Sequence, residues 1–318
     1  MEKIIVIVGP TASGKSSIAI ELAHLLDGEI VSADSMQIYK GMEIGTAKTM
    51  KNEMQGIPHH LIDFLEYNQD FSVADYKDYA EKVISDILTR GKTPIVCGGT
   101  GLYIDALVKN INFKVENTEV DESEVDDNQV REQLLAEHKL KGNEWVHDLL
   151  RQIDPVSAEQ IHPNNVKRVI RALEVTIRTG VPFSQHKKDA VANPSKFDFI
   201  LFCLEYPRED LYKRINERVD LMFANGLIEE AKKLYDNMLF DSKTAAQAIG
   251  YKELTAYFLG NNSIEEVKER IKMETRRFAK RQSTWFKRYS HANVINCMNQ
   301  SPKENALKIS HLLSCYEK

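Results

Sequence analysis

A short glycine-rich segment, GPTASGKS, occupies Gly9–Ser16 and leaves few folds open to this chain. It follows the β-branched run Ile4–Val8 and precedes apolar residues at helical spacing, so a buried strand, a loop and a helix follow one another. This order and the spacing G-x-x-x-x-G-K-S are typical of a P-loop, whose backbone N–H groups surround phosphate oxygens. Lys15 would add a positive charge and the Ser16 hydroxyl would reach Mg²⁺. The expected phosphate-binding residues are Gly9, Pro10, Thr11, Ala12, Ser13, Gly14, Lys15 and Ser16.

Further apolar runs predict other strands of the same sheet, at Glu29–Ala33, Pro94–Cys97 and Phe199–Leu204. A helix is expected over Val73–Thr89, with Ser72 as its N-cap. Strands that alternate with helices favour a parallel sheet whose functional loops stand at the carboxyl ends of the strands. The expected fold class is therefore α/β, with a P-loop NTPase-like parallel-sheet core.

The stretch between the last two of these strands differs in character. Glu116–Asp127 contains seven acidic residues and no Lys or Arg, which indicates a solvated segment. Val130–Thr179 follows a helical pattern that is broken at Asp154-Pro155 and at His162-Pro163. We expect a helical insertion domain at residues 113–195, and a P-loop core with a helical C-terminal part at residues 1–112 and 196–318.

The net charge of −5 argues against general electrostatic binding of nucleic acid, so such binding would require a local basic patch. Lys268–Arg288 is the candidate, because nine Lys or Arg against two acidic residues give 9 − 2 = +7, with aromatic residues interleaved. The alternative is a solvated charged helix whose aromatic side chains pack inward. The four cysteines have no Cys-x-x-Cys spacing, and no signal-peptide or membrane-spanning run is present. We therefore expect a cytoplasmic protein with reduced thiols. A monomer is a separate expectation, which no sequence feature supports.

The P-loop alone does not identify the phosphate compound that it binds. Nucleotide hydrolases normally also have a hydrophobic strand that ends in a metal-holding acid, whereas the run Pro94–Cys97 leads into Gly98-Gly99-Thr100. The acid that closes a strand near the loop is Asp34. It could act as a general base, hold Mg²⁺ through water, or cap a turn, and spacing alone leaves these three roles open.

Several blocks of the sequence together resemble the bacterial tRNA dimethylallyltransferases. They follow the family's order over about residues 3–288, and the ordered set is far more specific than any single block. The blocks are GPTASGKS, VSADSMQIYKGMEIGTAK (Val31–Lys48), GIPHHLID (Gly56–Asp63), GGTGLY (Gly98–Tyr103), DPVSAEQIHPNN (Asp154–Asn165), RVIRALEV (Arg168–Val175), LYKRINERVDLM (Leu211–Met222), AIGYKE (Ala248–Glu253) and TRRFAKRQSTWFKR (Thr275–Arg288).

This resemblance implies a reaction and its reactants. A dimethylallyl group would pass from dimethylallyl diphosphate to the N6 amine of the adenine at position 37, 3′-adjacent to the anticodon of a tRNA, and diphosphate would leave. The P-loop would hold the donor's diphosphate, although the motif by itself also indicates nucleotide (ATP) binding. The absence of a strand-closing acid agrees with this reading. That acid holds the metal ion in phosphoryl transfer, and this reaction transfers no γ-phosphoryl group.

The resemblance also implies roles for individual residues. Asp34 matches the family's general base, Thr100 a hydroxyl beside the reacting centre, and Arg218 an arginine on the leaving diphosphate. Arg214 lies one helical turn before Arg218 and is a second candidate for the diphosphate contact. Apart from the resemblance, either arginine could be an ordinary solvated surface residue.

A target adenine in a folded anticodon loop has to be unstacked before it can react. The resemblance places Asp34, Ser35, Met36 and Gln37 at that base, although Gln37 alone could be an ordinary turn residue. The chain departs from its relatives in the acidic run Glu116–Asp127 and in having Asn165 where Asp is common, and it lacks the zinc finger of eukaryotic relatives. The other implied tRNA-binding residues are Asn165, Lys167, Arg168, Arg171, Gly250, Tyr251, Arg276, Arg277, Lys280, Arg281 and Gln282.

Three other functions remain open from the sequence. A small-molecule kinase would place ATP on the same loop and an acceptor hydroxyl at Asp34, but it would need the metal-holding acid that is missing here, and it would not need the +7 stretch. A transferase that prenylates free adenine nucleotides would not need the helical insertion or the basic C-terminal helix. A non-enzymatic P-loop module would leave Asp34, Thr100 and Arg218 without a task.

Overall fold

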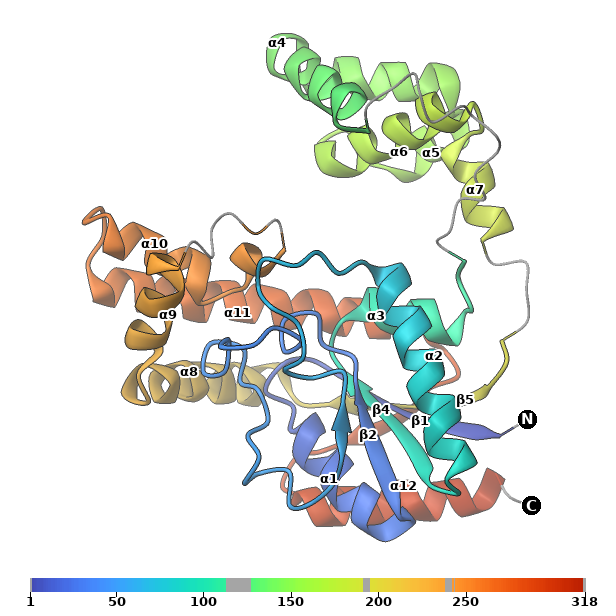
Figure 1. The fold of residues 1–318 in the computed structure, drawn as a ribbon, viewed down its shortest axis with the longest axis vertical. Coiled ribbons are helices and arrows are strands. Elements are labelled where there is room, and N and C mark those ends of the chain that lie inside the picture. The colour runs from blue at the N-terminus through green and yellow to red at the C-terminus, as the bar shows by residue number, and fades with distance from the viewer. Residues whose placement is uncertain (1, 113–126, 191–194, 238–241, 243, 317–318) are drawn as a thin grey trace. The chain divides into compact units, whose positions relative to one another are not determined.

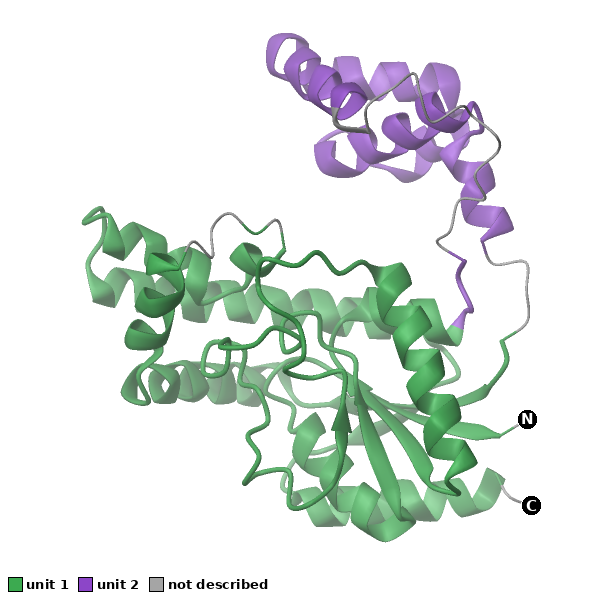
Figure 2. Cartoon of the chain, in the orientation of Figure 1, with its two compact units in different colours: residues 1–108, 195–318 green, residues 109–194 purple. Residues whose placement is uncertain are grey.

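The computed structural model describes residues 2–112, 127–190, 195–237, 242 and 244–316. These residues form two compact units, each described by itself (Figure 2): unit 1 comprises residues 1–108 and 195–318, and unit 2 comprises residues 109–194. The boundaries fall within a few residues of the expected insertion at 113–195. The acidic run Glu116–Asp127 lies outside the described residues, apart from Asp127, where α4 begins.

Unit 1 is built around a six-stranded sheet in the order β3-β2-β4-β1-β5-β6, and every neighbouring pair is parallel (Figure 1). This confirms the expected α/β fold class. The four apolar runs predicted as strands are β1, β2, β4 and β5, each within one residue of its expected ends. The strands are β1 Lys3–Val8, β2 Gly28–Ser32, β3 His59–His60, β4 Thr93–Gly98, β5 Asp198–Glu205 and β6 Asn293–Asn296.

Helices cover both faces of this sheet (Figure 1). Successive residues of a strand point to opposite faces, and so Ile4 and Val6 pack with α2 (Val73–Thr89) and α3 (Gly101–Val108), whereas Ile5 and Ile7 pack with α1 and α12. Helix α1 spans Lys15–Leu26 and α12 spans Pro302–Tyr316. The predicted bounds of α2 are confirmed, and its N-cap Ser72 accepts a hydrogen bond from the backbone N–H of Asp75.

The helical C-terminal part of unit 1 packs beside the carboxyl edge of the sheet. Its helices share a core with the loop that follows β2, which contributes Ile38, Tyr39 and Met42. Because of this packing, a loop from the N-terminal part of the chain is held by helices from its C-terminal part. The elements are α8 Arg208–Ala224, α9 Leu227–Asp236, the 3₁₀ helix η2 Ala245–Gln247, α10 Tyr251–Phe258 and α11 Ile264–Phe286.

Unit 2 is helical and has its own apolar core, in which Val146 and Leu150 of α4 meet Val169 and Leu173 of α6. The helix breaks predicted at Asp154-Pro155 and His162-Pro163 both occur. Asp154 caps α5 by accepting from the N–H of Ser157, and proline stands in the first turn of that helix. The helices are α4 Asp127–Ile153, α5 Pro155–Gln160, α6 Val166–Thr179 and α7 Phe183–Asp189.

No helix among the residues that the structure describes is both long enough and apolar enough to cross a membrane.

Candidate active site

The P-loop stands at the carboxyl end of β1, and Lys15 begins α1. Gly14, the N-cap of that helix, has a φ of 80°, a left-handed conformation that glycine adopts without strain. The Lys15 ammonium donates to the carbonyl oxygen of Pro10 at 2.8 Å. Burial lowers the pKa of Lys15 to about 8, because the charged form loses solvation.

A cavity of about 400 Å³ opens at this loop, and we call it the P-loop cavity. Besides the loop, the residues after β2, the end of β4 and one side of α8 form its walls. Three cations and the carboxylates of Asp34 and Glu217 line it. Many of the site residues predicted from the sequence line this cavity together: Thr11, Ala12, Gly14, Lys15, Ser16, Asp34, Gln37, Arg214, Arg218 and Gln282.

Both candidate arginines of α8 reach the P-loop. Arg218 donates from Nη2 to the hydroxyl of Thr11, and Arg214 donates from Nε to the carbonyl oxygen of Ala12 at 2.9 Å. Burial lowers the pKa of Arg218 to about 10, partly offset by the nearby Asp34 charge, so the guanidinium remains charged at neutral pH. Its buried Nε has no hydrogen-bond partner among the described residues. Arg218 is therefore a half-buried cation with one buried donor still to satisfy, whereas Arg214 is exposed and its guanidinium lies 5.0 Å from the ring centroid of Tyr206.

Asp34 follows β2 and lies in the wall of the P-loop cavity. Its Oδ1 accepts the backbone N–H groups of Met36 at 2.9 Å and Gln37 at 3.4 Å, so this oxygen caps the turn. No hydrogen bond to Oδ2 is found within the described part of the chain. Turn capping and a role as base are therefore compatible, because each uses a different oxygen. Thr100 secures the same turn, since its Oγ1 accepts the N–H of Ser35 at 2.9 Å.

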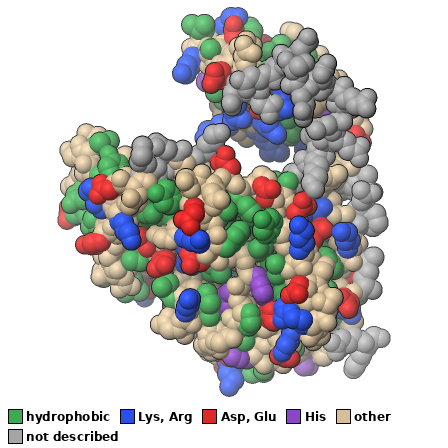
Figure 3. Space-filling view, viewed as in Figure 1, with side chains coloured by type: hydrophobic (Ala, Val, Ile, Leu, Met, Phe, Trp, Pro, Cys, Tyr) green, Lys and Arg blue, Asp and Glu red, His purple; other side chains and the backbone are tan. Residues whose placement is uncertain are grey.

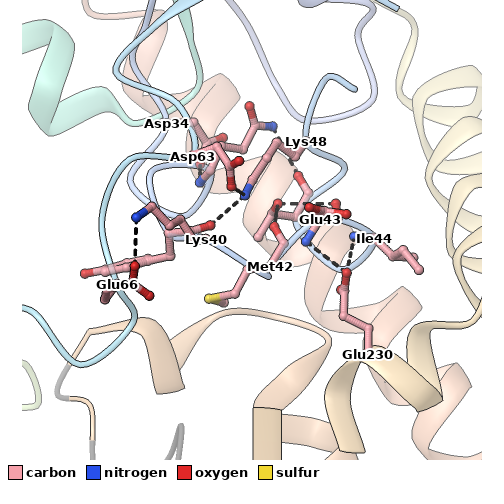
Figure 4. Close-up of polar contacts among 12 residues, drawn as sticks. Asp34, Lys40, Met42, Glu43, Ile44, Lys48, Asp63, Glu66 and Glu230 are labelled. Carbon is pink, nitrogen blue, oxygen red and sulfur yellow. Dashed lines mark hydrogen bonds and ion pairs between the residues drawn. The ribbon is translucent and has the colours of Figure 1, made fainter. Parts of the chain in front are cut away.

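Figure 4 shows how the loop from Asp34 to Lys48 is fixed. Glu230 of α9 accepts the N–H groups of Glu43, Ile44 and Gly45 at 2.9 to 3.0 Å. The buried Lys48 donates to the carbonyl oxygen of Tyr39 and to Asp63 Oδ1, both at 2.6 Å. Within this loop the Gln37 amide donates to the carbonyl oxygens of Thr46 and Ala47 at 3.2 Å, which leaves its Oε1 as an acceptor.

Gln282 does not lie where an RNA contact would place it. Its side chain is buried, its Oε1 accepts the N–H of Thr11 at 2.8 Å, and its Nε2 donates to the carbonyl oxygen of Gly99 at 2.9 Å. A Cβ on Gly99 would stand 2.3 Å from that Nε2, so glycine is needed for the approach. We therefore correct the expected tRNA contact of Gln282: its amide braces the P-loop against the turn after β4.

The remaining predicted RNA residues of unit 1 divide into two groups. The expected tRNA contact of the Tyr251 side chain is corrected by its burial: it is 1% exposed and donates its hydroxyl to Glu230, so it supports the loop from inside. Gly250 is the N-cap of the same helix. Arg276 donates to Asn216 of α8 at 2.6 Å. The exposed members are Arg277, Lys280 and Arg281 on α11.

In unit 2 the predicted RNA residues lie at the start of α6. Asn165, Lys167, Arg168 and Arg171 are all exposed. Arg171 is held by the buried Glu174 at 3.0 Å. Figure 3 shows several Lys and Arg side chains gathered on unit 2, whereas acidic and basic side chains are interspersed over the visible face of unit 1.

The predicted metal ligand is the Ser16 hydroxyl, and Ser16 lines the P-loop cavity. Among the described residues, no group of three His, Cys, Asp or Glu side chains is arranged to hold a metal ion. The donor set at the loop is one hydroxyl with Asp34 and Glu217 in the same cavity. Such a set fits Mg²⁺, which keeps several waters and is commonly held through substrate phosphates and few protein oxygens.

The fold and the site together define a class: a P-loop α/β protein in which the loop, a strand-closing carboxylate and two arginines meet in one cavity. Comparison with known proteins then identifies the family. The chain belongs to the IPP transferase family, whose model matches residues 37–289. The matched range begins after the P-loop and Asp34, but the similar proteins below extend over nearly the whole chain.

Two curated relatives are both named tRNA dimethylallyltransferase. The protein of Acetivibrio thermocellus is 49% identical over 93% of this chain and 92% of its own length. The protein of Geobacillus thermodenitrificans is 47% identical over 98% of this chain and 95% of its own length.

Solved structures give the same family. The tRNA isopentenylpyrophosphate transferase of Bacillus halodurans superposes with a TM-score of 0.72 and 41% identity over 99% of this chain and 96% of its own. A eukaryotic dimethylallyltransferase acting on tRNA superposes with a TM-score of 0.81 and 29% identity over 99% of this chain and 80% of its own.

Proposed function

We propose that this chain transfers a dimethylallyl group from dimethylallyl diphosphate to N6 of the adenine 3′-adjacent to the anticodon of tRNA, releasing diphosphate. As a member of the IPP transferase family the chain is a prenyltransferase, and its curated relatives are named for this reaction on tRNA. The observation that carries the proposal is the P-loop cavity, where the carboxylate of Asp34 shares one space with the cations Lys15 and Arg218.

The chemistry follows from that arrangement. The N6–carbon bond forms as the allylic carbon–oxygen bond breaks, and the bonding pair leaves with diphosphate. Asp34 takes the N6 proton, and its fixed Oδ1 keeps the carboxylate in place. A positioned base contributes about 10²–10⁴-fold in rate. Lys15 and Arg218 offset the charge that develops on the leaving group, and they do so most strongly because they are desolvated.

Two further contributions belong to the same proposal. Mg²⁺, when bound, would neutralise diphosphate oxygens, and the Ser16 hydroxyl is the protein group that would hold it. Thr100 would keep the Asp34 turn in position through its bond to the Ser35 N–H. Both roles leave the proton transfer to Asp34.

The tRNA would be held by two basic surfaces. The exposed Lys280 and Arg281 of α11 would contact the phosphate backbone near the reacting adenine. In unit 2, Lys167, Arg168 and Arg171 would contact the backbone, and Asn165 could contribute only a neutral hydrogen bond. Gln37 would read a base through its remaining Oε1 acceptor.

The test is to incubate the protein with Mg²⁺, labelled dimethylallyl diphosphate, and either tRNA or AMP, with ATP and hydroxyl acceptors in a parallel arm. Label should enter tRNA at the adenine beside the anticodon. Label in AMP alone, or phosphoryl transfer from ATP alone, would contradict the proposal. Asp34→Asn should keep tRNA affinity and lose about 10²–10⁴-fold in turnover, because the amide cannot accept the proton. An equal loss of affinity would instead make Asp34 an RNA contact.

We further propose that the enzyme works in the cytoplasm, where tRNA is found, and as a monomer with one tRNA. Light scattering of the protein, free and bound to tRNA, gives the masses directly. A dimer that persists on dilution would contradict the monomer.

A further inference from the structure

A second cavity, of about 390 Å³, borders the P-loop but contains neither Asp34 nor Lys15. Pro10 is one wall, and the others are the end of β5, the first turns of α8 and the last turns of α11. We call it the tyrosine cavity, after Tyr206 and Tyr212, which both line it. Its base is apolar and formed in part by Leu204, Leu211 and Phe286, which are all buried.

The rim of the tyrosine cavity carries uncompensated positive charge. Arg208, Lys280 and Lys287 line it and are exposed, and none has a carboxylate within 4 Å in the part of the chain that the structure describes. Some other cations of α11 are paired, such as Lys272 with Asp220 at 2.9 Å and Arg277 with Glu274 at 2.7 Å. Glu205 is the single acid among the lining residues. The cavity therefore favours an anionic ligand.

The walls indicate what else that ligand contains. Tyr206 and Tyr212 are half-buried, so each offers ring surface to the cavity. The Arg208 guanidinium lies 5.1 Å from the ring centroid of Tyr212, which places a cation beside an aromatic plane. Proteins hold unstacked bases on aromatic rings and arginine planes, and hold the attached phosphates with nearby cations. A nucleotide has both parts.

We propose that the tyrosine cavity binds one nucleotide of the RNA substrate other than the adenine that reacts, with its base on Tyr212 and its phosphate at Lys280 and Lys287. The proposal rests on the proposed function, which supplies the RNA. Pro10 lines this cavity and Thr11 lines the P-loop cavity, so the two sites are separated by adjacent residues of one loop. An RNA loop that places one base at Asp34 passes close to the second site. The cavity would thus add sequence or shape selectivity beyond the reacting base.

The test uses anticodon stem-loop RNAs in which each loop nucleotide in turn is abasic. With the wild-type protein, the abasic change at one position besides the reacting adenine should weaken binding by about 5- to 150-fold, the usual range for one stacked base. Tyr212→Ala should weaken binding of the intact RNA by a similar factor. Because Tyr212→Ala has already lost the stacking of this base on the tyrosine ring, the abasic change at that position should not weaken its RNA binding further. Tyr212→Phe keeps the ring and should behave as the wild type.

Controls separate this result from general damage. Tyr257→Ala removes an exposed tyrosine on α10, outside both cavities, and should leave every abasic effect unchanged. If every abasic change weakens RNA binding by Tyr212→Ala by the same factor as it weakens binding by the wild type, Tyr212 is coupled to no loop position and the proposal is overturned. A second result would also overturn it: Tyr212→Ala weakens the binding of AMP but leaves RNA binding unchanged. The site would then serve a free nucleotide.

Failure of this proposal can be told from failure of the proposed function. If the wild-type protein puts no dimethylallyl label into tRNA, the proposed function fails. If it labels tRNA normally and Tyr212 shows no coupling to any loop position, only the second nucleotide site fails.

Discussion

Replacing Gln282 by leucine removes the brace between the P-loop and the turn after β4 while nearly keeping the side-chain volume. The buried amide makes two hydrogen bonds, of 2.8 Å with the Thr11 N–H and of 2.9 Å with the Gly99 carbonyl. Leaving each partner unsatisfied costs about 1–3 kcal/mol, so the free energy of unfolding should fall by about 2–6 kcal/mol, less what the added apolar burial returns. Chemical denaturation of Gln282→Leu against the wild type measures this difference.

The functional consequence separates two roles for Gln282. A P-loop that has lost its brace binds diphosphate less well, so we expect the KM for dimethylallyl diphosphate to rise about tenfold, equivalent to about 1.4 kcal/mol. The affinity for tRNA, measured without donor, should change less than about twofold, because a buried amide makes no RNA contact. Glu265→Gln, at an exposed position of the same helix, is the control. A variant that loses tRNA affinity and keeps its donor KM would refute the reasoning and restore the RNA contact expected from the sequence.

Other predictions concern charges of the same region. Because burial holds the pKa of Lys15 at about 8, its ammonium is charged below that pH and neutral above it. Affinity for inorganic diphosphate should therefore fall as pH rises through about 8, and Lys15→Arg should remove this step; a wild-type profile that matches Lys15→Arg would contradict the assignment. Replacing Lys280 and Arg281 by glutamine should weaken tRNA binding and reduce its slope against log salt by about 1.4, for two contacts at about 0.7 each; an unchanged slope would remove α11 from the RNA surface. Glu230→Gln should lower the free energy of unfolding by about 1.5–3 kcal/mol, since a charge-assisted acceptor of three backbone N–H groups is lost; equal denaturation midpoints would argue against that bond set.

The sequence predicts the parts of this fold that local chemistry determines. Apolar β-branched runs give β1, β2, β4 and β5, and Ser72 marks the start of α2, because these signals lie within a few residues. It misses β3 and β6, since His59–His60 and Asn293–Asn296 are short, largely polar edge strands that pair only when the rest of the sheet is present.

Long-range contacts explain the errors at the site. Nothing near Tyr251 in the sequence shows that its ring fills the space left by Gly45. Gln282 is different, because a signal was present. Ile271, Thr275, Ala279, Gln282 and Phe286 recur at helical spacing and are all buried, so they form one inward face of α11. The high charge of that helix belongs to its other faces, so charge alone does not distinguish the inward Gln282 from the exposed cations beside it.

Thr11 has a consequence for how the protein is made. Its backbone N–H is bonded to Gln282 and its hydroxyl to Arg218, partners more than 200 positions later in the chain. Strand β1, too, pairs on one side with β5, which is synthesised after the whole of unit 2. Closing so long a loop is slow unless the intervening segment has already become compact, and unit 2 has a core of its own. We therefore expect unit 2 to fold first on a ribosome-bound chain. The P-loop should reach its phosphate-binding conformation only after α11 has emerged from the ribosome.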